Sequence, residues 1–141
     1  RPPRSTLFPY TTLFRSYALW SATAGMGLSE SDSKESIASF LERNPGHSFV
    51  CACNEELVGT VLCGHDGRRG YLYHVAVSEA HRNKGIGKQL IQAALRSLHS
   101  AGIVKCHLMV FTDNEAGNQF WEKCGWKRRK DIYIYSSSTN A

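Results

Sequence analysis

A short segment at residues 82–88 combines basic side chains with glycine and reads Arg-Asn-Lys-Gly-Ile-Gly-Lys. Glycine lets an anion approach the backbone closely, and the free N–H groups and dipole at a helix start attract phosphate. A helix begins within this segment, because apolar residues recur at four-residue steps, at Ile86, Leu90, Ala94 and Leu98. We therefore expect a phosphate-binding turn here.

Two common nucleotide-binding motifs do not fit this turn. A Walker A loop would place glycine at Arg82 and a hydroxyl residue at Gln89. A dinucleotide-binding fingerprint would place a third glycine at Leu90, within a parallel βαβ unit. Both alternatives are excluded, and an Arg-x-x-Gly-x-Gly pattern after a Val-Ala-Val strand remains.

The strands before the turn predict an antiparallel arrangement. Residues 48–53 and 57–64 are short apolar runs joined by Asn-Glu-Glu, which predicts a hairpin. A second turn at residues 65–70 leads into a strand at residues 71–77. Consecutive strands joined by tight turns form an antiparallel meander, and not a doubly wound parallel sheet.

Helices are expected on either side of these strands. Residues 17–20 end one helix, and a loop follows at residues 23–31. Asp32 and Glu35 have the spacing of a capping box for a second helix, which ends at Asn44.

Beyond the turn, the pattern predicts a strand, a helix and a last strand. Residues 105–111 alternate as a strand, and Asp113-Asn114 can start a helix that Gly125 ends. The last strand contains the alternating residues 132–135.

The loop and the element order together resemble the GCN5-related N-acetyltransferase (GNAT) superfamily, whose acetyl-coenzyme A loop reads Gln/Arg-x-x-Gly-x-Gly/Ala. Asn114, followed by Phe120-Trp121 and Gly125-Trp126, is similar to the second signature of that family. The resemblance covers residues 16–135. It implies an α+β fold, with a central, mostly antiparallel sheet, a splayed strand and helices on both faces. The family's first strand would lie before Ser16, where it is not recognisable, so we expect it to be missing.

By this resemblance the cosubstrate is acetyl-CoA. Its pyrophosphate would lie on the N–H groups of residues 84–88, while the strand at residues 75–77 would pair with the pantetheine amides and offer an N–H to the thioester carbonyl. The implied cosubstrate-binding residues are Val75, Ala76, Val77, Arg82, Asn83, Lys84, Gly85, Ile86, Gly87, Lys88, Asn114 and Phe120.

The resemblance implies direct attack of a primary amine on the thioester in a ternary complex. Trp121 and Met109 stand where family members carry a tyrosine acid or a glutamate base. We therefore nominate His74 as the base and Tyr133 as the acid, because histidine titrates near neutral pH. Other groups on the sheet and just past it could serve instead, namely Tyr73, Glu79, His107 and Tyr135. Each of these side chains could equally be packed or solvated, with water carrying the proton.

Three functions stay open at this point. The first is an acetyl-CoA-dependent N-acetyltransferase that acts on a small-molecule or peptide amine. The second is an acyl-CoA-binding domain with little transfer activity, which Met109 and Trp121 motivate. The third is a nucleic-acid-binding module, which only the net charge of +5 favours. Arg82, Lys84 and Lys88 gather at one helix start, so we expect a small polyphosphate ligand and no nucleic acid.

Composition sets further expectations for the 141 residues. The five cysteines include a Cys-x-Cys pair but no zinc-knuckle spacing, so we expect no metal. No run approaches the ~18 apolar residues of a membrane helix. We expect a cytoplasmic monomer or homodimer without a membrane partner.

Residues 1–16 differ from the rest of the chain. They hold three arginines and no acid, and Thr-Leu-Phe occurs in them twice. They resemble a translated sequencing adaptor, so we expect a non-native leader at residues 1–16, an acetyltransferase domain at residues 17–136 and a disordered tail at residues 137–141.

Overall fold

A five-stranded sheet organises the first part of the chain. The computed structural model describes residues 4–8 and 13–140, and the chain forms two compact units, Arg1–Met109 and Val110–Ala141. The sheet lies in the first unit with the order β1-β2-β3-β4-β5. Its strands are β1 (Arg4–Leu7), β2 (Phe49–Cys53), β3 (Glu56–His65), β4 (Gly70–Val77) and β5 (Cys106–His107). The first four pair antiparallel and β5 pairs parallel with β4, which confirms the expected mostly antiparallel α+β fold.

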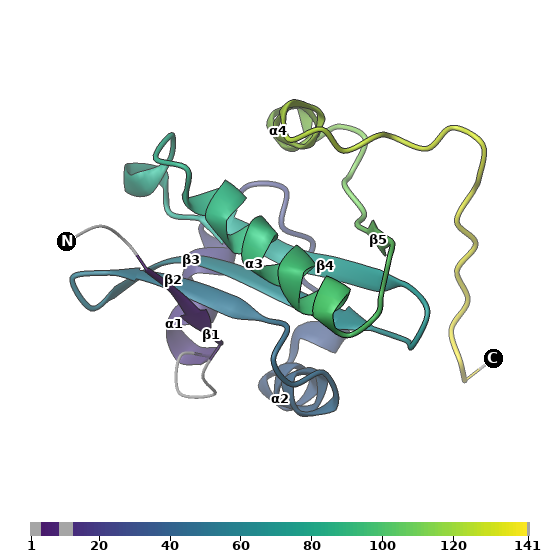
Figure 1. Ribbon diagram of the computed structural model, residues 1–141, viewed down its shortest axis with the longest axis horizontal. Helices are drawn as coiled ribbons and strands as arrows, with labels where there is room; N and C mark the ends of the chain where they lie inside the picture. The colour runs from purple at the N-terminus through teal and green to yellow at the C-terminus, as the bar shows by residue number, and fades with distance from the viewer. Residues whose placement is uncertain (1–3, 9–12, 141) are drawn as a thin grey trace. The chain divides into compact units, whose positions relative to one another are not determined.

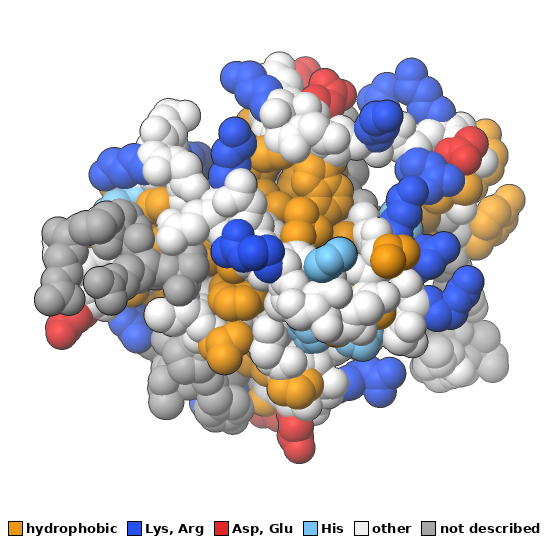
Figure 2. All heavy atoms as spheres, in the orientation of Figure 1, with side chains coloured by type: hydrophobic (Ala, Val, Ile, Leu, Met, Phe, Trp, Pro, Cys, Tyr) orange, Lys and Arg blue, Asp and Glu red, His pale blue; other side chains and the backbone are white. Residues whose placement is uncertain are grey.

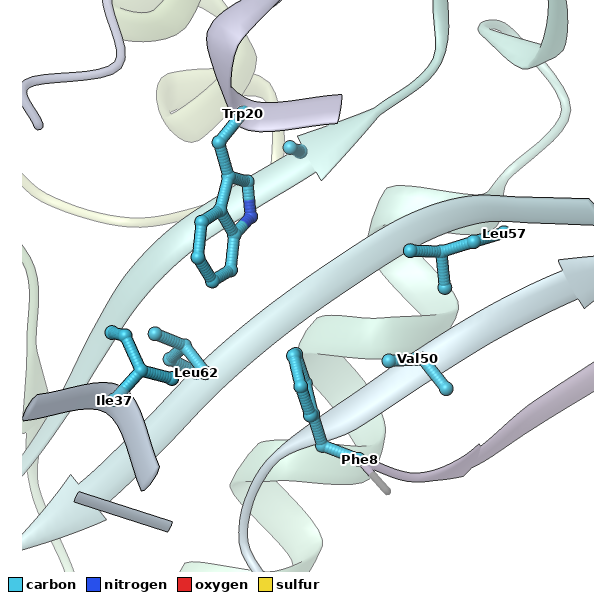
Figure 3. Close-up of a cluster of buried hydrophobic side chains, with 7 residues drawn as sticks. Phe8, Trp20, Ile37, Val50, Leu57 and Leu62 are labelled. Carbon is cyan, nitrogen blue, oxygen red and sulfur yellow. The ribbon is translucent and has the colours of Figure 1, made fainter. Parts of the chain in front are cut away.

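Helices cover both faces of this sheet, as Figure 1 shows. The helix α3 (Ile86–Ser100) lies on one face, and α1 (Leu13–Ser21) and α2 (Lys34–Arg43) lie on the other. The predicted apolar stripe of α3 is buried, because Ile86, Leu90, Ala94 and Leu98 all pack inward. On the opposite face, Trp20, Ile37 and Leu62 form a cluster with Phe8, Val50, Leu57 and Ala76 (Figure 3).

The first strand is present, contrary to the expectation that it is missing. β1 pairs with β2 from Arg4 opposite Ala52 to Leu7 opposite Phe49, and the Phe8 N–H donates to the Ser48 carbonyl at 2.8 Å. The open edge of β2 offers unpaired backbone groups to any adjacent extended segment, and an apolar residue such as Phe8 can then be buried. Residues 1–3 and 9–12 of the expected leader lie outside the described residues, and its non-native origin stays a prediction.

A β-bulge interrupts the pairing of β3 with β4. Thr60 faces Ala76 and Leu62 faces Tyr73, so β4 has one more residue than β3 in this interval. His74 lies within the bulge and has a φ of 49°, in the left-handed region that is uncommon for a residue other than glycine.

The cap that starts α2 differs from the predicted one. The N-cap is Ser33, whose side chain accepts a hydrogen bond from the Ser36 N–H. Asp32 instead ends the 3₁₀ helix η2 (Glu30–Asp32) and forms a capping box with Ser29. A serine hydroxyl next to the first turn satisfies the free N–H groups, which releases the Asp32 carboxylate for other contacts.

The second unit contains α4 (Glu115–Lys123), which was predicted. The Asn114 side chain caps it by accepting from the Gly117 N–H at 3.0 Å, and Gly125 ends it with a φ of 87°. The ring of Trp121 packs edge-on against Trp126.

Two predicted strands are wrong or too long. β5 covers only Cys106–His107 of residues 105–111, and residues 132–135 form no strand. Ile132, Tyr133, Ile134 and Tyr135 are exposed. Alternation alone does not make a strand, because each strand needs a neighbour to complete its backbone hydrogen bonds.

Candidate active site

The start of α3 has the features of an anion site. Its N-cap is Gly85, at a φ of 79°, with no side-chain cap, so the first N–H groups of the helix have no intrahelical acceptor. Residues 82–85 and Lys88 are exposed, whereas Ile86 and Gly87 are buried against the sheet. Asn83 also has a positive φ, of 62°. The loop thus presents cations and free N–H donors at one helix end.

The loop is tied directly to the end of β4. The Arg82 Nε donates to the Val77 carbonyl at 3.1 Å, across the short helix η3 (Glu79–His81). The Ser78 N–H donates to the Val58 carbonyl of β3 at 2.8 Å. These bonds fix the distance between the start of α3 and residues 75–77.

Residues Val75–Val77 have an unpaired backbone edge. On one side Ala76 and Val77 pair with Thr60 and Gly59 of β3. On the other side, β5 pairs only with Gly70 and Tyr71, so within the described part of the chain no strand continues beside residues 75–77. Such an edge can pair with the amides of an extended ligand.

His74 makes a contact that the sequence did not predict. Its Nε2 lies 2.5 Å from Oδ1 of Asp32, and both side chains are nearly buried, at 11% and 12% exposure. The Asp32 Oδ2 accepts the Ser29 N–H at 2.8 Å. This places an imidazole and a carboxylate together at the bulge next to residues 75–77.

A second set of contacts holds the backbone and ring of His74. The indole Nε1–H of Trp20 donates to Thr60 Oγ1 at 2.9 Å, and the Thr60 hydroxyl donates to the His74 carbonyl at 2.8 Å. The centroids of the Trp20 and His74 rings lie 4.8 Å apart. Tyr17 packs edge-on against Trp20 and donates its hydroxyl to the Asp32 main-chain carbonyl.

Two tyrosines near this region keep their protons at neutral pH. Burial, followed by the charges of Asp32 and Glu35, raises the pKa of Tyr17. Burial also raises the pKa of Tyr73, and Tyr71 and Cys106 add to that shift. Tyr73 packs edge-on against Phe40 of α2, and its hydroxyl can donate a proton.

The remaining predicted residues belong to the second unit. There the side chain of Asn114 caps α4, Phe120 contacts Trp121 with 5.2 Å between ring centroids, and Tyr133 is 89% exposed. Val75, Ala76, Val77, His74 and the loop at residues 82–88 all lie in the first unit, along one continuous stretch of chain.

Sequence reasoning missed Asp32, Thr60 and Trp20 as neighbours of His74. Asp32 had a complete local explanation as a helix cap, and 42 residues separate it from His74. The signal in the sequence was Ser33, because this serine can cap α2 in place of Asp32 and leaves the Asp32 carboxylate free for another contact.

In Figure 2, Lys and Arg side chains, drawn in blue, are more prominent than Asp and Glu side chains, drawn in red. No helix in the described ranges is long and apolar enough to cross a membrane. Within those same ranges, no group of three His, Cys, Asp or Glu side chains is placed to hold a metal ion.

Comparisons with known proteins agree on one family. The model of the acetyltransferase (GNAT) family matches residues 13–126. N-alpha-acetyltransferase 30 of Schizosaccharomyces pombe is 34% identical over 113 residues, which cover 77% of this chain and 75% of that protein. An acetyltransferase of Pectobacterium atrosepticum is 37% identical over 92 residues, 65% of each chain.

Solved structures share the fold. Ard1 of Thermoplasma volcanium has a TM-score of 0.77 at 19% identity, over 87% of this chain and 81% of that one. The PaiA N-acetyltransferase of Thermoplasma acidophilum, solved in complex with coenzyme A, has a TM-score of 0.75 at 19% identity, over 90% and 91% of the two chains.

Proposed function

The chain belongs to the acetyltransferase (GNAT) family, and from that premise we propose that it transfers the acetyl group of acetyl-CoA to a primary amine by direct attack in a ternary complex. One observation carries this proposal. The unpaired edge of residues 75–77 runs, through a loop held by Arg82, into the uncapped and basic start of α3. An extended ligand with a pyrophosphate at one end and amides along its arm matches that arrangement.

The proposed cosubstrate contacts follow from these donors. The N–H groups of residues 84–88 bind the pyrophosphate, and the side chains of Lys84 and Lys88 add positive charge. Val75, Ala76 and Val77 pair with the pantetheine arm and place an N–H against the thioester carbonyl, where negative charge develops. Asn114 and Phe120 stay proposed as cosubstrate-binding residues, as the family resemblance implies.

Transfer requires the amine to lose a proton as it attacks. The amine nitrogen forms a bond to the thioester carbon, the carbon–sulfur bond breaks, and the thiolate leaves with the electron pair. We assign the proton of the amine to His74, directly or through water, and the protonation of the thiolate to Tyr133 or Tyr73.

A peptide amine is the acceptor class to test first, because the relative in Schizosaccharomyces pombe is an N-alpha-acetyltransferase. Small amines remain a second class. A cytoplasmic location and a monomeric or homodimeric state remain predictions from the sequence.

The alternative function is acyl-CoA binding with little transfer. It is favoured by Met109 and Trp121, whose side chains cannot titrate, at positions where the family resemblance implies an acid or a base.

The test is release of free thiol from acetyl-CoA in the presence of short peptides, amino acids, polyamines or aminoglycosides. Mass spectrometry should find the acceptor heavier by one acetyl group. Coenzyme A binding without turnover of any acceptor would favour the alternative, and failure to bind coenzyme A would contradict both functions.

A further inference from the structure

The Asp32–His74 pair lies beside the strand that we propose to hold the thioester, and it joins two segments that are distant in sequence. The Nε2–Oδ1 distance of 2.5 Å is that of a charge-assisted hydrogen bond. Nearly buried pairs of this kind have a defined geometry, unlike exposed ion pairs, which exchange with water. The contact therefore orients the His74 ring.

Asp32 is itself held on several sides. Its second oxygen, Oδ2, accepts the Ser29 N–H at 2.8 Å, and its main-chain carbonyl accepts the Tyr17 hydroxyl. The carboxylate therefore cannot turn away from His74 without breaking the capping box of η2.

A carboxylate only accepts hydrogen bonds, so the hydrogen on a neutral His74 ring must be on Nε2. The lone pair is then on Nδ1. Of all the described residues, none forms a hydrogen bond with Nδ1. Nδ1 is thus the ring atom that can accept a proton.

The rest of the surroundings restrict how the ring can move. The bulge gives His74 its positive φ, the Thr60 hydroxyl binds its carbonyl, and the Trp20 ring lies against its imidazole. Asp32 of η2 is the titratable group that faces His74, and Tyr17 of α1 binds the main-chain carbonyl of Asp32. Burial, followed by the charges of Asp32 and of Glu35 in the first turn of α2, raises the pKa of Tyr17.

We propose that Asp32 is a positioning residue that holds His74 as the Nε2–H tautomer, so that Nδ1 takes the proton from the attacking amine. This inference rests on the proposed acetyl transfer. As the carbon–nitrogen bond forms and the carbon–sulfur bond breaks, the proton moves from the amine nitrogen to Nδ1. Asp32 stabilises the resulting imidazolium, which then returns the proton to water or to the tyrosinate that remains after Tyr133 or Tyr73 has protonated the thiolate.

The first test measures the tautomer of His74 directly. Nitrogen-15 NMR of the full chain labelled in histidine distinguishes the two tautomers by the shifts of the ring nitrogens, and His74→Ala identifies the signal. We expect Nε2 to carry the hydrogen at a pH where the ring is neutral. A ring with its hydrogen on Nδ1 would overturn the proposal.

The second test compares Asp32→Asn with Glu30→Gln. Both changes remove one charge from η2, but Glu30 is exposed and lies outside the pair. We expect Asp32→Asn to lower kcat at least about tenfold with little change in the KM for acetyl-CoA, because general-base catalysis contributes about 10²–10⁴-fold. Asp32→Glu should recover part of the rate, and Glu30→Gln should behave as wild type.

An unchanged kcat in folded Asp32→Asn would overturn the proposal. If the wild-type protein transferred no acetyl group at all, the proposed function would fail, whereas the NMR result would still decide the tautomer.

Discussion

His47 and His74 are two histidines of the same unit with opposite surroundings. His74 faces a carboxylate, whereas His47 faces Ser97 and a second histidine, His65, whose ring lies 5.1 Å away. The Ser97 hydroxyl donates to the Ala94 carbonyl at 2.7 Å, so the His47 Nδ1–H must donate to Ser97 Oγ. Burial, followed by the charge of His65, lowers the pKa of His47.

This lowered pKa predicts a loss of stability in acid. Histidine has a pKa of about 6.5 in the unfolded chain. Above that pH, His47 is neutral in both states and does not make the free energy of unfolding depend on pH. As the pH falls below that value, the unfolded chain takes up the proton first, so the free energy of unfolding decreases until the pH passes the lower folded pKa. The slope from this group cannot exceed about 1.4 kcal/mol per pH unit.

Urea unfolding between pH 8 and pH 5 checks this prediction with His47→Gln, which should flatten the pH dependence below about pH 6.5. The control is His99→Gln, on the exposed side of α3. Equal slopes in wild type and His47→Gln would contradict the prediction.

At the scale of elements, the basic side chains of α3 differ in their distance from the start of the helix. Its start combines an uncapped Gly85 with Lys88, while Arg96 is exposed eight residues further along the same helix. The rise of an α-helix separates the two positions by about 12 Å, which exceeds the screening length in physiological salt.

We predict that Lys88→Glu weakens coenzyme A binding at least about tenfold, because it places a negative charge against the pyrophosphate. Arg96→Glu makes the same change of charge on the same helix and should alter the affinity less than about twofold. Isothermal titration calorimetry at physiological salt measures both. Similar losses in the two variants would argue against the anion site at residues 84–88.

Close packing of α3 on β3 depends on one glycine. A Cβ at Gly59 would lie 2.9 Å from Leu90 Cδ1 and 3.0 Å from Ile86 Cγ2, and 3.3 Å from the Ala76 carbonyl oxygen. These distances leave no room for a methyl group below the first turns of α3.

Gly59→Ala should therefore destabilise the fold by about 1–3 kcal/mol. In a double-mutant cycle, Leu90→Ala removes the atom that clashes most, so the double variant should lose less than the sum of the two single changes. Chemical denaturation measures all four proteins. Strict additivity would show that α3 does not press on Gly59.

At the scale of the whole molecule, the first described segment takes part in the fold. Phe8 is buried at 9% exposure, whereas the neighbouring Leu7 is 56% exposed. The centroids of the Phe8 and Trp20 rings lie 6.4 Å apart. The same Trp20 contacts His74, so the leader and the proposed site share one apolar cluster.

Phe8→Ala should lower the free energy of unfolding by about 3 kcal/mol, the usual cost of removing a buried aromatic ring. Leu7→Ala, on the same strand, should change it by less than about 0.5 kcal/mol. Urea titration of the two variants and the wild type measures these free energies of unfolding. If the two variants were equally stable, residues 4–8 would not contribute to the core.

Local patterns predicted most elements and the pairing of consecutive strands, but not the pairing of β1 with β2. The stripe of α3, the hairpin of β2 and β3, and the left-handed residue Gly125 all follow from short-range rules. Residues 132–135 have an equally good strand pattern, yet they form no strand. The sequence predicts a leader at residues 1–16, and backbone pairing within it joins Leu7 to β2 and the Phe8 N–H to the Ser48 carbonyl.

By itself the sequence identified the family, predicted an anion-binding turn and nominated His74, because each inference rests on residue types at fixed spacing along the chain. Only the tertiary structure decided that Asp32 lies against His74, that a bulge sets the conformation of that histidine, and that residues 75–77 have an open edge. These features depend on contacts between segments far apart in the sequence. Such contacts arise when the sheet and its covering helices pack together, and no local pattern encodes the partner.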